Sequence, residues 1–303
     1  MASPVDCPIG ARATLAQRAD DPHALLARLR AAEPVSWLPA LDGWLVTRHD
    51  LVLAEMRDTG TFTVDDPRFS TGLIVGPSML TRDGDEHARH RAAFAAPFRV
   101  GAVRERFAPI AAAETERLLD PLELAGRGEL RRSYAGPLAA AASGHGLTHE
   151  ELAAAAVEES LRLEPAAAVV GRNPTRDTIL GEARIARGDL VRLSIAAANR
   201  DPDVFATPDR FALHREDRRH LAFAHGPHMC VGVHLARLEA RTALTALLAR
   251  FPRLRLDPHR RAPAVRGLVF RKPAALEVLC GPSGTAEPRL RSAGPARRRW
   301  PAT

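Results

Sequence analysis

Residues 223–232 read FAHGPHMCVG and place one cysteine between two glycines, immediately before a long helix pattern. A helix that begins near Gly232 leaves its first backbone N–H groups unpaired. These groups and the helix dipole favour a thiolate at Cys230. Gly226 and Gly232 allow a tight loop and the close approach of a flat ligand to the backbone. The pattern fits three roles for Cys230: an iron ligand, a nucleophile activated by a histidine, or a structural thiol.

The same ten residues meet a spaced pattern, FxxGxHxCxG, at every fixed position. These positions are Phe223, Gly226, His228, Cys230 and Gly232. The pattern resembles the haem-binding loop of the cytochrome P450 family, the haem-thiolate monooxygenases, and the flanking HLAF and VHLARLEAR resemble its bacterial members. The resemblance implies that Cys230 is the axial ligand of haem b (heme, iron protoporphyrin IX), whose iron gains electron density that favours O–O cleavage. It also implies that His228 contacts a haem propionate and that Phe223 packs near the sulfur.

Glu159 and Arg162, in EESLR at 158–162, lie three residues apart and share a helix face. Alone, such a pair is a solvated contact that adds little stability. The segment resembles the ExxR helix of the same family, which implies a buried ion pair joined by a residue of the loop before the cysteine. The segments AAANRDP and FATPDRF resemble the region that supplies this partner, with Arg210 or Arg215 as candidates.

Two further segments complete the expected haem site. HARHR at 87–91 resembles the HxxxR helix of the family, which implies that His87 and Arg91 hold propionates. Arg172, in VVGRNPTRD, occupies the place of another propionate-binding arginine. Without the resemblance, a His/Arg pair four residues apart is ordinary helix surface.

The spacing of apolar residues predicts a mainly helical chain with a small mixed β-sheet. Residues 35–48 alternate around Pro39 and Gly43 like a hairpin, and residues 166–201 contain two or three short strands. Residues 202–222 are expected to be irregular. With the resemblance, the fold class is that of cytochrome P450, truncated on the distal side of the haem.

Helix start and stop signals divide the rest of the chain. Asp83 with Glu86 forms a capping-box pattern, and THEE at 148–151 forms another. Residues 101–143 are expected to hold helices broken at Pro109, at Pro121, at the glycines near 126 and at Pro137. Helices are expected over 21–33, 51–58, 83–97, 151–164 and 232–251.

The interval before the ExxR segment is short. Residues 133–151 lead almost directly to it, whereas the family has several helices there, including a long distal one with an AGxxTT-like stretch. We expect an internal deletion near 140–150 and a chain shorter than usual by on the order of a hundred residues. We also expect no acid followed by threonine in an alanine-rich helix, so no catalytic residue for proton delivery is identified.

The resemblance, which covers residues of about 20–280, implies a monooxygenase. Such an oxidoreductase oxidises a small organic substrate with O2 and electrons from a ferredoxin/ferredoxin reductase pair. The missing distal groups deliver protons in the family, work that is typically worth about 10²–10⁴ in rate. The alternative is therefore a catalytically impaired haem protein or pseudoenzyme that helps another enzyme. A third interpretation is an internal-deletion product.

Composition indicates a globular protein, because 303 residues with 46% hydrophobic content can bury a large core. No stretch approaches the roughly twenty apolar residues of a membrane span, and the first residues lack the apolar core of a signal peptide. We therefore expect a cytoplasmic protein. Its three cysteines are widely spaced and odd in number, which argues against a disulfide framework.

The net charge of +7 is unevenly distributed along the chain, since residues 287–303 carry five arginines against one glutamate. This tail has the composition of a solvated, disordered segment, which argues against nucleic-acid binding. The expected regions are an N-terminal arm (1–19), a haem domain (20–280) and the basic tail (281–303).

Three kinds of partner follow from the resemblance. Arg104, Arg237 and Arg241 are expected contacts for an acidic electron-transfer protein. The substrate is expected to be small and hydrophobic. Apolar surface left by the missing helices predicts self-association.

Overall fold

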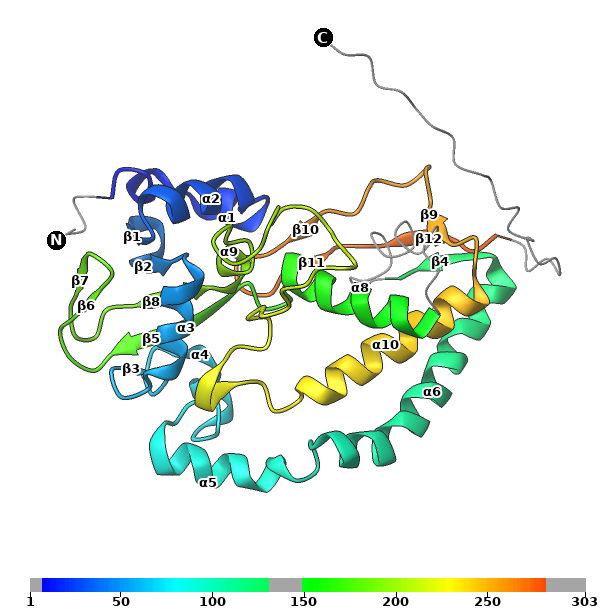
Figure 1. Cartoon of the computed structure of the whole chain (residues 1–303), viewed down its shortest axis with the longest axis horizontal. Coiled ribbons are helices and arrows are strands. Elements are labelled where there is room, and N and C mark those ends of the chain that lie inside the picture. The colour runs from blue at the N-terminus through cyan, green and yellow to red at the C-terminus, as the bar shows by residue number, and fades with distance from the viewer. Residues whose placement is uncertain (1–6, 131–148, 282–303) are drawn as a thin grey trace, which may run out of the picture.

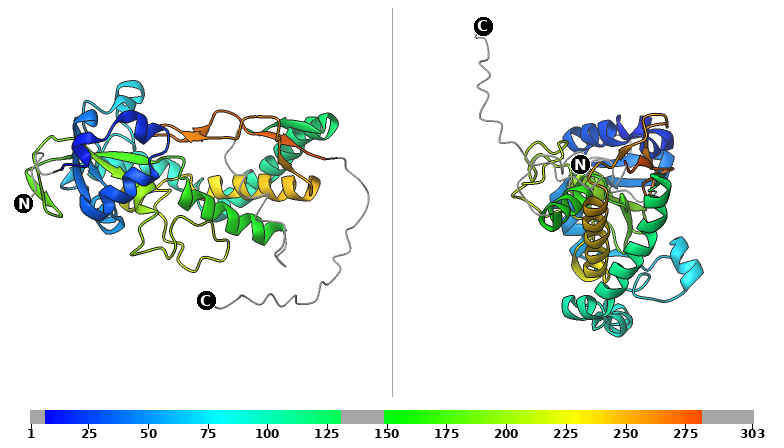
Figure 2. Two further views of the ribbon diagram at one scale, coloured as in Figure 1. Left: turned by 90° about the horizontal axis from the view of Figure 1, so that it is seen from above. Right: turned by 90° about the vertical axis from the view of Figure 1, so that its right-hand side faces the viewer.

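The computed structural model describes residues 7–130 and 149–281 of the chain. They form a mainly helical molecule with several small sheets, which confirms the expected fold class (Figure 1). The main sheet and the N-terminal helices lie at one end (Figure 1, Figure 2). The other end consists largely of three long helices: α6 (Val100–Ala125), α8 (His149–Leu163) and α10 (Val233–Arg250).

The main sheet has five strands in the order β1-β2-β8-β5-β3 and mixes parallel and antiparallel pairs. β1 (Val35–Leu38) and β2 (Gly43–Val46) form the expected antiparallel hairpin around η3 (Pro39–Leu41). β2 runs parallel to β8 (Val191–Ser194). β5 (Val169–Pro174) pairs antiparallel with both β8 and β3 (Phe62–Thr63).

Strand β2 is buried on both faces, which fixes its place in the sheet. Because side chains alternate along a strand, Trp44 and Val46 pack in a cluster with Met56 of α3 (His49–Arg57). Leu45 points the other way and packs in a cluster with Leu29 of α2 (His23–Ala32). The two helices therefore cover opposite faces of the hairpin.

The segment after α8 holds more strands than the two or three expected. Besides β5 and β8 it forms a separate hairpin of β6 (Thr178–Leu180) and β7 (Ala183–Ile185), and α9 (Ile195–Ala198) follows β8. Between α9 and η4 (Gly226–His228) no named helix or strand occurs, as expected for this proline-rich stretch.

Proline does not break α6, so the expected helix ends at Pro109 and Pro121 are wrong. Both prolines lie inside one helix of 26 residues. Each removes a backbone N–H bond, but both are exposed, and water can pair with the freed carbonyl groups. The helix bends along its length (Figure 1) and ends at Gly126, which adopts a left-handed conformation. The break expected at Pro137 lies outside the described residues.

Helices α8 and α10 pack against one another and carry the second half of the core. Leu152 and Val157 of α8 share a cluster with Leu244 and Leu248 of α10. On its other side α10 packs with Leu119 of α6 in a further cluster. The expected helices at 151–164 and 232–251 are thereby confirmed. The THEE cap and most of the expected deletion at 140–150 lie outside the described residues.

Short elements complete the described chain. η2 (Gly10–Arg12) and α1 (Leu15–Ala19) belong to the expected N-terminal arm, and Cys7 beside them is 1% exposed and packs in the core. The three regional boundaries remain a prediction. The remaining elements are α4 (Ser70–Val75), α5 (Gly84–Ala95), β4 (Arg127–Glu129), β9 (Arg255–Leu256), β10 (Val265–Arg266), β11 (Lys272–Pro273) and β12 (Glu277–Leu279).

Apolar side chains are exposed on the helices α4 and α6. Leu73 and Ile74 of α4 are 77% and 85% exposed, and Ile110 and Leu124 of α6 are 62% and 90% exposed. Among the described residues, no helix is long and apolar enough to cross a membrane.

Candidate functional site

The Cys230 loop is a tight turn closed by backbone bonds. The N–H of Cys230 donates to the carbonyl oxygen of Phe223 over 2.9 Å, and Met229 N–H donates to Gly226 over 3.0 Å. The loop ends at the first turn of α10, as the sequence predicted, and the cysteine is exposed. Its thiol is therefore presented to the surroundings and not packed in the core.

The two glycines of the loop occupy different environments, and a side chain would have a different effect at each. Gly226 has a φ of +72°, and a Cβ there would lie 2.5 Å from the carbonyl oxygen of Met56, so the loop could not pack on α3 with a side chain. Gly232 has an ordinary φ of −83°. A Cβ at Gly232 would meet only the sulfur of Cys230, at 3.9 Å. This glycine therefore keeps space open beside the thiol.

His87 and His228 lie together beside the loop. Their ring centroids are 4.2 Å apart. The two ring nitrogens of His87 lie 3.0 Å from the carbonyl oxygens of Met79 and Pro227. A neutral imidazole can donate to only one of them. Burial and the charge of His228 lower the pKa of His87, so one of its nitrogens faces a carbonyl oxygen without a proton.

Asp83 joins this pair to the sheet, and it does not cap α5. Its carboxylate accepts from the His228 ring over 2.5 Å, from the Thr63 hydroxyl over 2.6 Å and from the Val64 N–H over 2.9 Å. No side-chain bond caps the helix that follows, so the expected capping box is wrong. Burial alone would raise the pKa of Asp83, but the bonds from His228 and Thr63 outweigh it and lower the pKa. The carboxylate stays ionised for tertiary contacts.

Arg172 is a buried cation whose hydrogen bonds are incomplete. Its residue is 4% exposed, Nη1 donates to the Gly171 carbonyl over 2.7 Å, and its buried Nε has no partner. Burial lowers the pKa of Arg172, against the opposing influence of Asp83 and Glu55. A buried guanidinium N–H without an acceptor is costly, so this position favours an added anionic group.

Glu55, which the sequence did not single out, is a buried acid whose charge acts on Arg172. It is 4% exposed, its buried Oε2 has no partner, and burial and the charge of Asp58 raise its pKa to about 8. The sequence does hold a signal, because Glu55 falls on the helix face of Val52 and Met56. An acid on an apolar helix face is rarely without a role.

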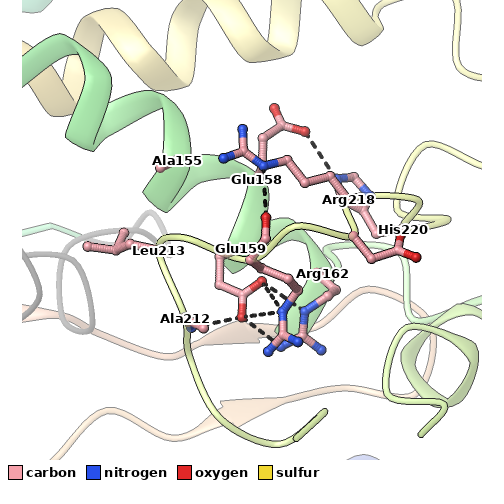
Figure 3. A pocket seen from close by; sticks show the side chains of 10 residues that line it. Ala155, Glu158, Glu159, Arg162, Ala212, Leu213, Arg218 and His220 are labelled. Carbon is pink, nitrogen blue, oxygen red and sulfur yellow. Dashed lines mark hydrogen bonds and ion pairs between the residues drawn. The ribbon is translucent and has the colours of Figure 1, made fainter. Parts of the chain in front are cut away.

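Glu159 and Arg162 form the expected buried ion pair. Their side chains are 4% and 1% exposed, and Arg162 donates to both carboxylate oxygens of Glu159 over 2.8 Å (Figure 3). Arg162 also donates to the carbonyl oxygens of Asn199, Pro208 and Arg210, at 2.8, 2.7 and 3.2 Å. The pair ties the irregular stretch before the cysteine loop to α8.

The third member of this cluster is Arg215, so the expected role of Arg210 as the ion-pair partner is wrong. Arg215 Nε lies 3.1 Å from both oxygens of Glu159, whereas Arg210 contributes only its carbonyl oxygen. Ala212 N–H adds a fourth donor to Glu159 over 2.9 Å. Burial would raise the pKa of Glu159, but the bonds from Arg162 and Ala212 and the charges of Arg162 and Arg215 together outweigh it and lower the pKa.

Arg237 and Arg241, expected to face a protein partner, turn instead toward Glu158. Arg237 donates to both carboxylate oxygens over 2.7 and 2.8 Å, and Arg241 lies 3.6 Å away. Arg104 is exposed on α6. Arg91 is half-buried and has no hydrogen bond within the described chain, although its charge acts on His87.

An acid followed by threonine does occur in an alanine-rich helix, contrary to expectation. It is Glu114 in the stretch AAAET of α6. The Glu114 side chain is 52% exposed and pairs with Arg117 at the helix surface. Its surroundings are those of a solvated pair, not of a buried proton relay.

Three observations fit a flat, anionic cofactor such as haem at this loop. The Cys230 thiol is exposed, Gly232 leaves open space beside it, and Arg172 offers a buried, unpaired Nε. Within the described ranges, no group of three or more His, Cys, Asp or Glu side chains could hold a metal ion.

Comparisons with known proteins agree with this geometry. The sequence model of the family described as Cytochrome P450 matches residues 146–275. The chain is 50% identical over 109 residues to "Cytochrome P450 105C1" of Streptomyces sp, which is 35% of this chain and 28% of that protein. It is 44% identical over 131 residues to "Nocardicin C N-oxygenase" of Nocardia uniformis subsp. tsuyamanensis, or 42% of this chain and 33% of that protein. The matched regions thus span less than two thirds of these relatives.

The similarity of the fold extends further along the chain than the similarity of the sequence. The crystal structure of CYP109E1 from Bacillus megaterium in complex with testosterone matches with a TM-score of 0.76 and 19% identity, over 89% of this chain and 100% of that one. At this identity the likeness shows a shared fold alone.

Proposed function

We propose that this chain is a haem-thiolate monooxygenase of the cytochrome P450 family, which its sequence and fold resemble, with Cys230 as the iron ligand. The observation that carries the proposal is the exposed thiol at a loop whose Gly232 leaves space beside the sulfur. His87, His228, Arg91 and Arg172 would hold the propionates of haem b. The chemistry that haem supplies when bound is the activation of dioxygen at a thiolate-ligated iron.

The chain's own residues position that ligand. The Cys230 N–H holds the loop closed through Phe223, and Gly226 lets the loop pack on Met56 of α3. On the other side, Glu159 and Arg162 fix the stretch that leads into the loop. The cysteine is therefore held between two rigid supports before any cofactor binds.

Arg172 and the pair of histidines supply the polar end of the proposed site. Arg172 brings a buried positive charge that lacks a full set of acceptors. The Asp83–His228 contact orients the His228 ring. A carboxylate that reached Arg172 would complete its bonding and offset the cost of its burial.

We propose that the substrate is a small hydrophobic molecule and that electrons come from a ferredoxin-type protein, consistent with the oxygenases that the sequence resembles. Arg104 is exposed on α6 and offers a contact for an acidic partner. Arg237 and Arg241 are paired with Glu158, so their charges are less available to such a partner. The comparisons do not favour the catalytically impaired alternative. A cytoplasmic location remains part of the proposal.

The test is spectroscopic. The protein is produced with haem supply, reduced and exposed to carbon monoxide, and the strongly red-shifted Soret band of thiolate ligation is expected. Cys230→Ser should remove that band, whereas Cys280→Ser, at a buried thiol far along the chain, should keep it. Purified wild-type protein without haem absorbance would overturn the proposal.

A further inference from the structure

Arg237 links three separate parts of the site. It lies on α10, and its guanidinium donates to both carboxylate oxygens of Glu158 on α8 over 2.7 and 2.8 Å. The same guanidinium lies over the ring of Phe223, 4.8 Å from the centroid. Phe223 begins the cysteine loop. One side chain thus contacts two helices and the loop that carries Cys230.

Glu158 is held in place by a second donor. His220, whose side chain is 2% exposed, lies 3.2 Å from its Oε2, and Figure 3 shows Glu158 turned toward His220 while Glu159 points to Arg162. Burial would raise the pKa of Glu158, but the bonds from His220 and Arg237 outweigh it and lower the pKa to about 2. The carboxylate is therefore ionised at neutral pH and available to Arg237.

The shape of the guanidinium matters for this arrangement. A planar fork that makes two parallel bonds to a carboxylate has a fixed plane, and that plane here covers an aromatic face. A lysine ammonium would keep the charge but would have neither the second bond nor the flat face. The contact with Phe223 therefore depends on the pairing with Glu158.

A displacement of the Phe223 ring would also displace Cys230, because the two residues are joined by a backbone hydrogen bond. The carbonyl oxygen of Phe223 accepts the Cys230 N–H over 2.9 Å, which closes the loop. Ala224, between them, has a φ of +58°, a strained conformation for a residue with a side chain. A loop that stores strain needs contacts at its base to keep one conformation.

We infer that Arg237 and Glu158 are positioning residues that clamp the Phe223 ring and so fix the Cys230 sulfur in its ligating position. The inference rests on the proposed function, because it concerns the sulfur as a haem ligand. It assigns Arg237 an internal role in place of the expected contact with a protein partner.

The experiment compares Arg237→Lys, Arg237→Gln and Glu158→Gln in the haem-loaded full chain. The control is Arg106→Gln, because Arg106 also lies over an aromatic ring, that of Phe107 at 5.7 Å, but on the surface of α6. Two quantities are measured: the fraction of the reduced carbon monoxide complex that shows the thiolate band, and the reduction potential of the haem.

A clamp predicts that all three site variants lower the ratio of thiolate-ligated to unligated complex by about 2- to 5-fold, the size expected for one cation–π contact. The reduction potential should shift in the same variants, whereas Arg106→Gln should behave as wild type. Haem content is measured in each, so that a variant that fails to fold is recognised, and Arg237→Lys then serves as the mildest change.

The outcomes separate the two proposals. If the wild type lacks the thiolate band, the proposed function fails. If the wild type shows the band while Arg237→Lys, Arg237→Gln and Glu158→Gln all keep its fraction and the potential unchanged, the clamp alone is overturned.

Discussion

Two buried polar clusters of this protein differ in whether they are complete. The cluster of Glu159, Arg162 and Arg215 leaves no buried side-chain atom of these three residues without a partner. The cluster around Arg172 and Glu55 leaves a buried nitrogen and a buried oxygen unpaired. The first cluster has all its buried polar atoms paired and acts as a structural support. The second has unpaired buried atoms that a bound ligand could pair.

The largest effect should come from breaking the complete cluster. Arg162→Ala leaves the Glu159 carboxylate buried with fewer partners, which should cost about 3–5 kcal/mol of the free energy of unfolding. Urea unfolding measures it. The matched control is Arg117→Ala, which removes an ion pair of the same i,i+3 spacing with Glu114 at the surface of α6. It should cost far less, because both charges of that pair are solvated. Equal costs would show that the first cluster is no special support.

A substitution at Gly226 tests how tightly the cysteine loop packs on α3, next to the incomplete cluster. Gly226→Ala adds a Cβ at a φ of +72° and 2.5 Å from the Met56 carbonyl oxygen, and it should cost about 1–3 kcal/mol. Gly188→Ala is the control, because its φ is +82° but a Cβ there meets nothing within 4 Å. Urea unfolding should show the larger loss for Gly226→Ala. The reverse order would mean that the loop does not pack tightly on α3.

A substitution of Arg172 in the incomplete cluster should not destabilise the haem-free protein, but it should weaken haem binding. Arg172→Met removes an incompletely paired buried cation, so the haem-free protein should be unchanged or more stable. The same variant should bind haem roughly tenfold more weakly, since one charge-assisted hydrogen bond to a propionate is lost. Haem titration and thermal unfolding measure the two effects. A haem-free protein strongly destabilised by Arg172→Met would place this arginine with the structural cluster.

Glu55 should give the cluster a pH dependence of stability. Its pKa in the folded protein is raised to about 8, whereas the ordinary value is 4.5. As the pH rises from the ordinary value toward the raised one, the unfolded chain loses this proton and the folded chain keeps it, so stability falls. Glu55→Gln should remove that slope and raise the Tm by a few degrees at neutral pH. At acidic pH the two proteins should melt alike, and a neutral-pH Tm lower in the variant would contradict the assignment.

The smallest expected effect is on self-association, and it comes from exposed apolar side chains outside both clusters. Ile74 and Ile110 are 85% and 62% exposed, on α4 and α6, and we propose that they contribute to self-association. Light scattering of the wild type should show species larger than a monomer, and Ile74→Glu with Ile110→Glu should reduce them. A monodisperse wild-type monomer would refute this proposal.

The sequence alone predicted the elements that depend on local pattern. The hairpin around Pro39, the helix after the cysteine and the helix that carries Glu159 and Arg162 all formed as expected, since alternation and helical spacing act within a few residues. The spaced motif around Cys230 resembles the family whose sequence model matches residues 146–275. These are signals that a single stretch of chain contains in full.

Apart from the Glu159–Arg162 pair, the tertiary structure decided which partners the charged side chains of the site take. Asp83 leaves its helix cap for His228 and Thr63, Arg215 replaces Arg210 at Glu159, and Arg237 turns inward to Glu158. These contacts join residues far apart in sequence, and an ion or hydrogen bond is chosen by distance and burial, which local pattern does not contain. Local sequence therefore predicted several elements and the cysteine loop, while long-range packing decided the continuity of α6 and the partners of the charged side chains around the loop.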